Sequence, residues 1–251
     1  MSPRLRFAID AARAAGQTTL RYFQSGVTIE VKADGTPVTV ADQEAEATIR
    51  ALIAREFPGE AIYGEEHGEE GSGELRWVID PIDGTKSFVC GVPLYATLLS
   101  LERHGEPFLG VCFLPALNEI LYAETGHGAY WNDRRCAVSS TARLEEAALC
   151  CGAPTTLRRA GLGEATFGLG ERVRLLRSWT DAYGHVLVAT GRVDGMIDPV
   201  VAPYDVSALQ VIVREAGGQF TSVRGGSALS EGSALSSNGL IHEDLLGVLD
   251  T

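Results

Sequence analysis

Residues 77–88 read WVIDPIDGTKSF, and this segment constrains the fold and chemistry of the chain more than any other. Its apolar start, 77–79, is typical of a buried strand. Pro81 is expected to end the strand ladder, because proline has no N–H to donate. The residues after the strand are therefore expected to form a turn that leads into a helix.

Two carboxylates stand on this expected turn. Asp80 and Asp83 are three residues apart, and Gly84 and Thr85 form a pair that permits a tight turn and a helix start with free N–H groups. Carboxylates beside free backbone donors can hold divalent cations and a phosphate together. Taken alone, the same pattern is also a common Asp-rich β-turn, so it needs partners elsewhere in the chain.

Composition limits the possible partners. The 251 residues, 45% of them hydrophobic, suffice for one large domain or two small ones. No apolar run approaches the ~18 residues of a membrane span, and the N-terminus lacks a signal-peptide core, so we expect a cytoplasmic protein without a membrane partner. The net charge of −12 argues against nucleic acid and means that any phosphate site needs cations.

The cysteines indicate a reducing compartment. Their number is odd and no CxxC occurs, which argues against a disulfide framework or structural zinc. We expect reduced thiols in or near the core at Cys90, Cys112, Cys136, Cys150 and Cys151.

Hydrophobic periodicity predicts two helices, then an antiparallel sheet, then alternating helices and strands. The chain is expected to form a single domain, 1–251, with sublobes of about 1–135 and 136–251 and a boundary near 134–146. Helices are predicted at 3–25, 40–57, 181–190, 205–216 and 242–249. Strands are predicted at 28–32, 61–63, 77–79, 95–101, 108–114, 119–123, 129–131, 195–198 and 219–223. A polar turn is expected at 32–42 around Asp34 and Gly35, and a surface loop at 225–232.

Four further acidic positions can complete a site. Glu65 follows a predicted strand within Gly-Glu-Glu, Asp42 and Asp205 lie in first turns of predicted helices, and Asp198 ends a predicted strand. Each alone is better explained as a helix cap or a solvated charge.

Taken together in this order, GEE, DPIDGT and YD followed by a helix ending in EAGG resemble the inositol monophosphatase family of metal-dependent phosphatases. The resemblance covers nearly the whole chain, from Thr39 to the terminal helix. It implies an α/β fold, an α-β-α-β-α layered sandwich with an antiparallel sheet in the N-terminal half and a mixed sheet in the C-terminal half. It also implies a homodimer.

The resemblance assigns the metal ligands. Glu65, Asp80 and the carbonyl of Ile82 would bind one Mg²⁺, while Asp80, Asp83 and Asp205 would bind a second. A third, weaker ion would depend on Glu65, giving two to three ions per site. Carboxylate and carbonyl oxygens are the ligands that Mg²⁺ prefers.

The same resemblance assigns the remaining roles. The N–H groups of Gly84 and Thr85 would hold the phosphate, and the Thr85 hydroxyl with Asp42 would orient and deprotonate the attacking water. The reaction would be in-line hydrolysis of a small phosphorylated metabolite by a metal-activated water, without a covalent phospho-enzyme.

Other strings resemble the histidinol-phosphate phosphatase branch of the family. They are DGTKSF, CGVPLYATLL, KADGTPVTVAD and the PYD before the helix at 205. Asp181 falls where inositol-specific members carry a small residue, and a carboxylate there can pair with the ammonium of histidinol phosphate. Asp198 corresponds to an acidic residue that contacts substrate. Asp181 is equally well a helix N-cap, and the two roles are compatible.

Several alternatives stay open at this point. An inositol-1-monophosphatase or a broad-specificity phosphomonoesterase shares the motifs, as do phosphatases of nucleotide 3′-phosphates and of fructose bisphosphate. A metal-binding regulator without catalysis is disfavoured because every expected ligand is present. The arginines between 158 and 177 are expected to face solvent for the most part.

Overall fold

The larger of two main sheets runs through the first half of the chain in the order β10-β9-β8-β7-β6-β5-β3-β4. The structure, a computed structural model, describes residues 1–32, 35 and 37–250. Within this sheet β3 and β5 are parallel, and the other neighbouring strands are antiparallel. Its strands are β3 (Ala61–Gly64), β4 (Gly68–Glu70), β5 (Leu75–Asp83), β6 (Ala96–Arg103), β7 (Glu106–Leu114), β8 (Glu119–Glu124), β9 (Ala129–Trp131) and β10 (Arg134–Cys136).

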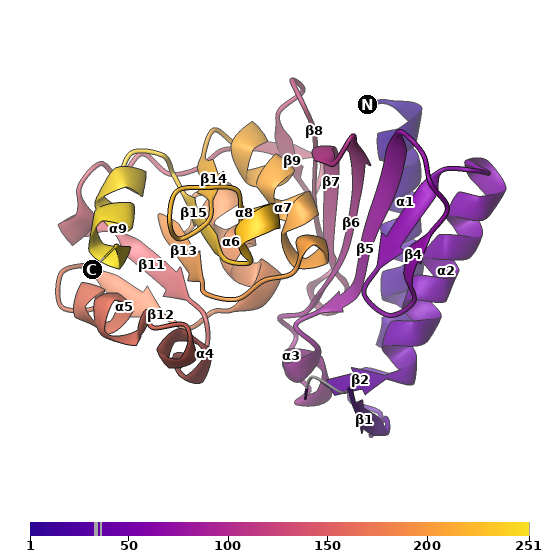
Figure 1. Cartoon of the computed structure of the whole chain (residues 1–251), viewed down its shortest axis with the longest axis horizontal. Coiled ribbons are helices and arrows are strands. Elements are labelled where there is room, and N and C mark those ends of the chain that lie inside the picture. Colours follow the sequence, from indigo (N-terminus) through magenta and orange to yellow (C-terminus); the bar gives the residue numbers. More distant parts are fainter. Residues whose placement is uncertain (33–34, 36, 251) are drawn as a thin grey trace.

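Two helix pairs cover the faces of this sheet (Figure 1). The outer pair is α1 (Pro3–Leu20) and α2 (Val40–Glu56), and the inner pair is α6 (Asp181–Ala189) and α7 (Pro203–Glu215). The helix starts follow from local chemistry. The Ser2 side chain accepts the amide of Leu5 ahead of α1, and Thr39 forms a capping box with Asp42 at α2.

The second sheet has the order β12-β11-β13-β15-β14 and mixes parallel and antiparallel pairs. Its outer face carries three helices, so the layers alternate α-β-α-β-α across the molecule (Figure 1). The strands are β11 (Ala148–Cys151), β12 (Leu175–Arg177), β13 (Gly195–Asp198), β14 (Gln219–Thr221) and β15 (Ala234–Ser237). The outer helices are α4 (Pro154–Arg159), α5 (Gly163–Leu169) and α9 (His242–Leu249).

This architecture confirms the predicted layered sandwich. The remaining elements are the hairpin of β1 (Ile29–Val31) and β2 (Pro37–Thr39), the short helices α3 (Thr85–Val89) and α8 (Ala228–Glu231), and two 3₁₀ turns. In the described part of the chain, no helix is long and apolar enough to cross a membrane. The division into two sublobes near residue 135 stays a prediction. One hydrophobic cluster contains side chains from both sheets, so the core does not divide at that point.

The prediction that Pro81 ends its strand is wrong. β5 continues to Asp83, and its register against β6 shifts between Asp80 and Asp83. Asp80 pairs with Leu98 and Asp83 with Ala96, so Pro81 falls inside the irregularity, where no ladder N–H is required. The two aspartates therefore lie on a bulged strand end rather than on a separate turn.

Several other predicted boundaries also need correction. β2 lies within the predicted polar turn, and Asp34 of that turn falls outside the described residues. α8 lies within the predicted loop, and α7 begins at Pro203 rather than at 205. Periodicity also missed β4, β10, β11, β12, β15, α4 and α5, because elements of three to seven residues are too short to show a period.

The cysteines only partly follow the prediction. Cys112, Cys150 and Cys151 are buried and Cys136 is half-buried, whereas Cys90 is exposed just after α3.

Gly110 on β7 allows α7 to approach the large sheet closely. A Cβ at this position would lie 2.3 Å from the carbonyl oxygen of Ala208, a backbone atom that cannot rotate away. We expect Gly110→Ala to lower stability by about 1–3 kcal/mol, or roughly 3–10 °C in Tm. Thermal unfolding would measure this. The control is Gly247→Ala, which adds a Cβ in open space on α9 and should leave the Tm unchanged or slightly higher.

Candidate active site

One cavity of about 560 Å³ lies where β5, α3, α6 and α7 meet. Within the described residues its lining includes six carboxylates and one lysine, Lys86. The carboxylates are Glu65, Asp80, Asp83, Asp181, Asp198 and Asp205. The fold thus brings the acidic residues predicted from five separate segments to one hollow.

Three of these carboxylates form a group that can hold a metal ion. One oxygen from each of Asp80, Asp83 and Asp205 lies within 4.8 Å of the others. Asp80 Oδ1 is buried and has no hydrogen-bond partner among the described residues. An unpartnered buried carboxylate oxygen is costly unless a cation pairs with it, so the donor set fits a hard divalent cation.

Backbone amides immobilise two members of this group. The amide of Ala182 donates to Asp83 Oδ2 at 2.6 Å, and the amide of Ala202 donates to Asp205 Oδ2 at 2.7 Å. Each carboxylate therefore anchors the first turn of an inner helix through one oxygen. The second oxygen of each carboxylate remains for a ligand, and the hydrogen bond to the helix restricts the direction in which that oxygen points.

Burial and mutual repulsion make the group electrostatically unfavourable without a cation. Burial raises the pKa values of Asp80 and Asp83 well above the usual carboxyl range, and neighbouring carboxylates raise them further. Burial also raises the pKa of Asp205 to about 7. Such clustering of raised pKa values is typical of functional sites.

Glu65 lines the same cavity but is paired with a lysine. Its Oε1 accepts from Lys32 Nζ at 2.9 Å, and the same ammonium lies 2.7 Å from Glu66 Oε1. Its amide donates to the carbonyl of Ile79, which places the residue beside the end of β5. The predicted role of Glu65 as a metal ligand stays a prediction.

The turn after β5 has the geometry expected of a phosphate-binding site. Gly84 is left-handed, with φ of 80°, and the amides of Gly84 and Thr85 stand at the first turn of α3, where helices leave N–H groups free. The Ile82 side chain is buried among aromatic rings, which fixes its backbone beside the cavity.

Thr85 and Asp42 are not hydrogen-bonded to each other within the described residues. The Thr85 hydroxyl donates to the Ile82 carbonyl at 3.1 Å. Asp42 is fully buried and does not line the cavity. Its Oδ2 accepts from the amide and hydroxyl of Thr39. Asp42 Oδ1 has no partner among these residues, and burial raises the pKa of this carboxyl.

Asp181 lies next to the expected phosphate-binding site. A Cβ on Gly84 would lie 3.1 Å from Asp181 Oδ2, so glycine leaves room for this carboxylate. Asp181 is the first residue of α6 with φ of 59°, and its Oδ2 accepts from the Thr180 hydroxyl at 2.9 Å. The N-cap position belongs to Thr180, so the cap interpretation of Asp181 is wrong.

Asp198 also lines the cavity. Its Oδ2 lies 4.0 Å from Nε2 of His185, a buried imidazole whose pKa is lowered to about 3 by burial and which is therefore neutral. Burial raises the pKa of Asp198 well above the usual range, and Asp181 and Asp205 raise it further.

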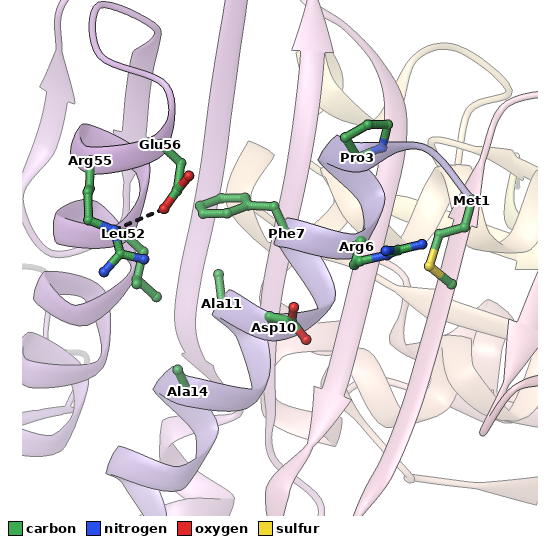
Figure 2. Close-up of a pocket in the computed structure, with 10 residues that line it drawn as sticks. All are labelled: Met1, Pro3, Arg6, Phe7, Asp10, Ala11, Ala14, Leu52, Arg55 and Glu56. Carbon is green, nitrogen blue, oxygen red and sulfur yellow. Dashed lines mark hydrogen bonds and ion pairs between the residues drawn. The ribbon is translucent and has the colours of Figure 1, made fainter.

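A second hollow, of about 510 Å³, lies between α1 and α2 (Figure 2). There Phe7 of α1 projects toward Leu52 of α2, and Arg55 pairs with Glu56. The described residues of this groove include no group of three metal-binding side chains. The acidic cavity is therefore the candidate active site.

Sequence reasoning missed three residues near this cavity. Lys32, which directly follows β1, pairs with Glu65, and no sequence spacing predicts this pair. Tyr204 lines the cavity, and its ring lies 5.8 Å from that of Tyr63. Glu46 lies on α2 four residues after Asp42, and this helical spacing was a signal that could have revealed it. The arginines at 158, 159, 172, 174 and 177 are exposed, as expected.

The sequence and the structure are both similar to those of known phosphatases. The model of the inositol monophosphatase family matches residues 1–250. A histidinol-phosphatase from Chlorobaculum parvum is 39% identical over 99% of this chain and 97% of its own length. A histidinol-phosphatase from Mycobacterium tuberculosis is 40% identical over 94% and 93%. A Thermotoga maritima IMPase structure superposes with a TM-score of 0.92 at 36% identity, covering 99% of this chain and 97% of that one.

Proposed function

Because the chain belongs to the inositol monophosphatase family, we propose that it is a Mg²⁺-dependent phosphatase that hydrolyses L-histidinol phosphate to L-histidinol and phosphate. This reaction would be a step of histidine biosynthesis. The phosphatase activity follows from the family. The substrate is our inference from the cavity and from the names of the relatives.

The residues present fit the metal that the family implies. Asp80, Asp83 and Asp205 offer carboxylate oxygens that lie within 4.8 Å of one another, close enough to share one ion, and Glu65 and Ile82 line the same cavity. Bound Mg²⁺ would supply charge neutralisation at the phosphoryl oxygens and a coordinated water of lowered pKa.

The chain itself would position the phosphate and the water. The amides of Gly84 and Thr85 would donate to phosphoryl oxygens, at no cost of reorganisation because the left-handed turn already holds them. The Thr85 hydroxyl and the unpartnered Asp42 Oδ1 would orient the attacking water, after Thr85 exchanges its bond to Ile82. The raised pKa of Asp42 suits a group that accepts a proton.

The position of Asp181 is the observation that carries the substrate assignment. Its carboxylate lies beside Gly84, and in histidinol phosphate the amino group is on the carbon next to the phosphorylated carbon. A phosphate held at Gly84 would therefore place the ammonium near Asp181, where a charge-assisted hydrogen bond can form. Inositol phosphate carries only hydroxyls at the corresponding distance.

The charge of the cavity also favours a cationic substrate. Two divalent cations would balance the charge of four of the six lining carboxylates. Asp181, Asp198 and a phosphate of about two negative charges would remain, and Lys86 is the one lysine in the described lining that can offset them. A substrate that brings its own positive charge relieves this imbalance, whereas a polyol does not. Asp198, which lines the same cavity, would contact another part of the substrate.

An inositol-1-monophosphatase or a broad-specificity small phosphomonoesterase is the second candidate. The structural similarity to the Thermotoga maritima IMPase favours it. Relative rates on the two substrates separate the candidates. The homodimer and the cytoplasmic location stay predictions of the sequence.

We expect Asp181→Asn to weaken histidinol phosphate turnover selectively. Asparagine tolerates the left-handed backbone at this position, so the variant removes the charge without adding strain. Loss of a hydrogen bond between charged groups should lower kcat/KM for histidinol phosphate by about 10–100-fold, mainly through KM. Phosphate release would measure this.

Inositol 1-phosphate is the control substrate, and its kcat/KM should change by less than about threefold because it has no ammonium to lose. An equal loss of kcat/KM on both substrates would show that Asp181 maintains the structure of the site. An unchanged kcat/KM on histidinol phosphate would show that Asp181 does not recognise the ammonium.

A further inference from the structure

Glu46 is a fully buried carboxylate that none of these roles uses. It lies on α2, one helical turn after Asp42. Its Oε2 accepts the amide of Glu66 at 2.7 Å, and its Oε1 accepts the amide of His67 at 3.1 Å. These amides belong to the turn between β3 and β4, the same turn that carries Glu65.

Two neighbours show that this contact is built into the fold. Arg50 Nε donates to Glu46 Oε1 at 2.7 Å, and its guanidinium also donates to the carbonyl of Gly68 at the far end of the turn. A Cβ at Gly64 would lie 2.2 Å from Glu46 Oε1, so only glycine lets the carboxylate reach the turn. Charge-assisted bonds of this kind are about twice as strong as neutral ones.

The contact determines where Glu65 points. The Glu65 amide is bonded to Ile79 on β5, and the next two amides are bonded to Glu46 on α2. Lys32 pairs with the side chains of both Glu65 and Glu66. Without Glu46 the turn would keep the bond from the Glu65 amide to Ile79 and the pairing of Gly64 with Gly68. The amides of Glu66 and His67 would lose their partner, and the middle of the turn could then follow Lys32 away from the cluster.

We propose that Glu46 is a positioning residue for the metal site, which holds the turn at Glu65–His67 so that Glu65 faces the group of Asp80, Asp83 and Asp205. It also links the helix that carries Asp42 to the turn that carries Glu65. This inference rests on the metal site of the proposed function and is independent of the substrate.

The test is Mn²⁺ binding to Glu46→Gln in the absence of substrate, measured by isothermal titration and by the loss of the free-ion EPR signal. Residues that orient metal ligands typically change affinity by 10–100-fold, so we expect the dissociation constant for Mn²⁺ to rise by about that factor. At saturating Mg²⁺ the change in kcat should be smaller than the change in metal affinity, because Glu46 touches no reacting atom.

Glu60→Gln is the matched control. Glu60 precedes the opposite end of β3, accepts a hydrogen bond from Trp77 Nε1 and pairs with Arg4. Both variants should lower the Tm, but Glu60→Gln should leave the Mn²⁺ affinity unchanged. Mn²⁺ affinity of folded Glu46→Gln within twofold of the wild type would overturn the proposal. Absence of Mn²⁺ binding to the wild type would instead overturn the metal site of the proposed function.

If Glu46→Gln does not fold, amide hydrogen exchange in the wild type tests whether Glu46 holds the turn. The amides of Glu66 and His67 should exchange much more slowly than those of the exposed turn at 72–74. Equal exchange in the two turns would show that Glu46 does not hold the turn, and the proposal would fail.

Discussion

Asp80→Asn should reduce kcat/KM by at least ~10³-fold, because each bound metal contributes several kcal/mol of charge stabilisation to the transition state. Asp80 is the predicted bridge between two ions and has a buried oxygen without a partner. Asparagine keeps its shape and removes the charge. Steady-state phosphate release and Mn²⁺ titration would measure the loss of turnover and of metal binding.

The same substitution should stabilise the metal-free protein at pH 8. Asp80 is buried beside Glu65, Asp83 and Asp205, which repel its charge. Removing that charge should raise the Tm by a few degrees while activity disappears. Asp10→Asn, on the solvent-facing side of α1, is the control and should change neither quantity. Retention of activity in Asp80→Asn would contradict its role as a ligand.

The second large effect is a fall in the stability of the metal-free protein as the pH rises from about 5 to about 8. A carboxyl whose pKa in the folded chain exceeds its unfolded value stabilises the fold below the unfolded pKa. That contribution is lost as the pH passes through the folded pKa, because the native state then binds more protons than the unfolded state. Asp205, with a pKa of about 7, places much of this loss within the stated window.

The expected size is roughly 2–4 kcal/mol, or roughly 5–10 °C in Tm, from this residue and its coupled neighbours. Thermal unfolding in chelator at several pH values would measure it, and added Mg²⁺ should remove the fall because bound cations take the place of the protons. A metal-free Tm that is flat or rises across this range would show that the carboxylates are not in mutual repulsion.

The layered fold and the set of site acids could be predicted because short local strings, GEE, DPIDGT and YD, resemble the inositol monophosphatase family, whose fold and ligands the resemblance implies. DPIDGT shows a strand end, two carboxylates and a helix start within six residues, and the long helices show clear hydrophobic periods. The structure confirms the fold and gathers the predicted acids in one cavity, except Asp42, which is buried outside its lining. The role of each acid in binding metal or substrate stays a prediction.

The features that escaped prediction depend on tertiary contacts. Pro81 remains in β5 because the bulge removes the need for its N–H, which only the pairing with β6 reveals. The contact between Gly84 and Asp181 joins positions almost a hundred residues apart. Lys32 and Glu65 lie 33 residues apart and meet only in the folded chain. Glu46 differs, because its spacing from Asp42 was visible in the sequence.

The proposed function is tested most directly by the ratio of kcat/KM for L-histidinol phosphate to that for inositol 1-phosphate, measured on the wild-type protein with Mg²⁺. Because the carboxylates of Asp181 and Asp198 favour a cationic substrate, the ratio should exceed about 10, and chelation should abolish both activities. A ratio below 1, or histidinol phosphate turnover that survives chelation, would contradict the proposed function.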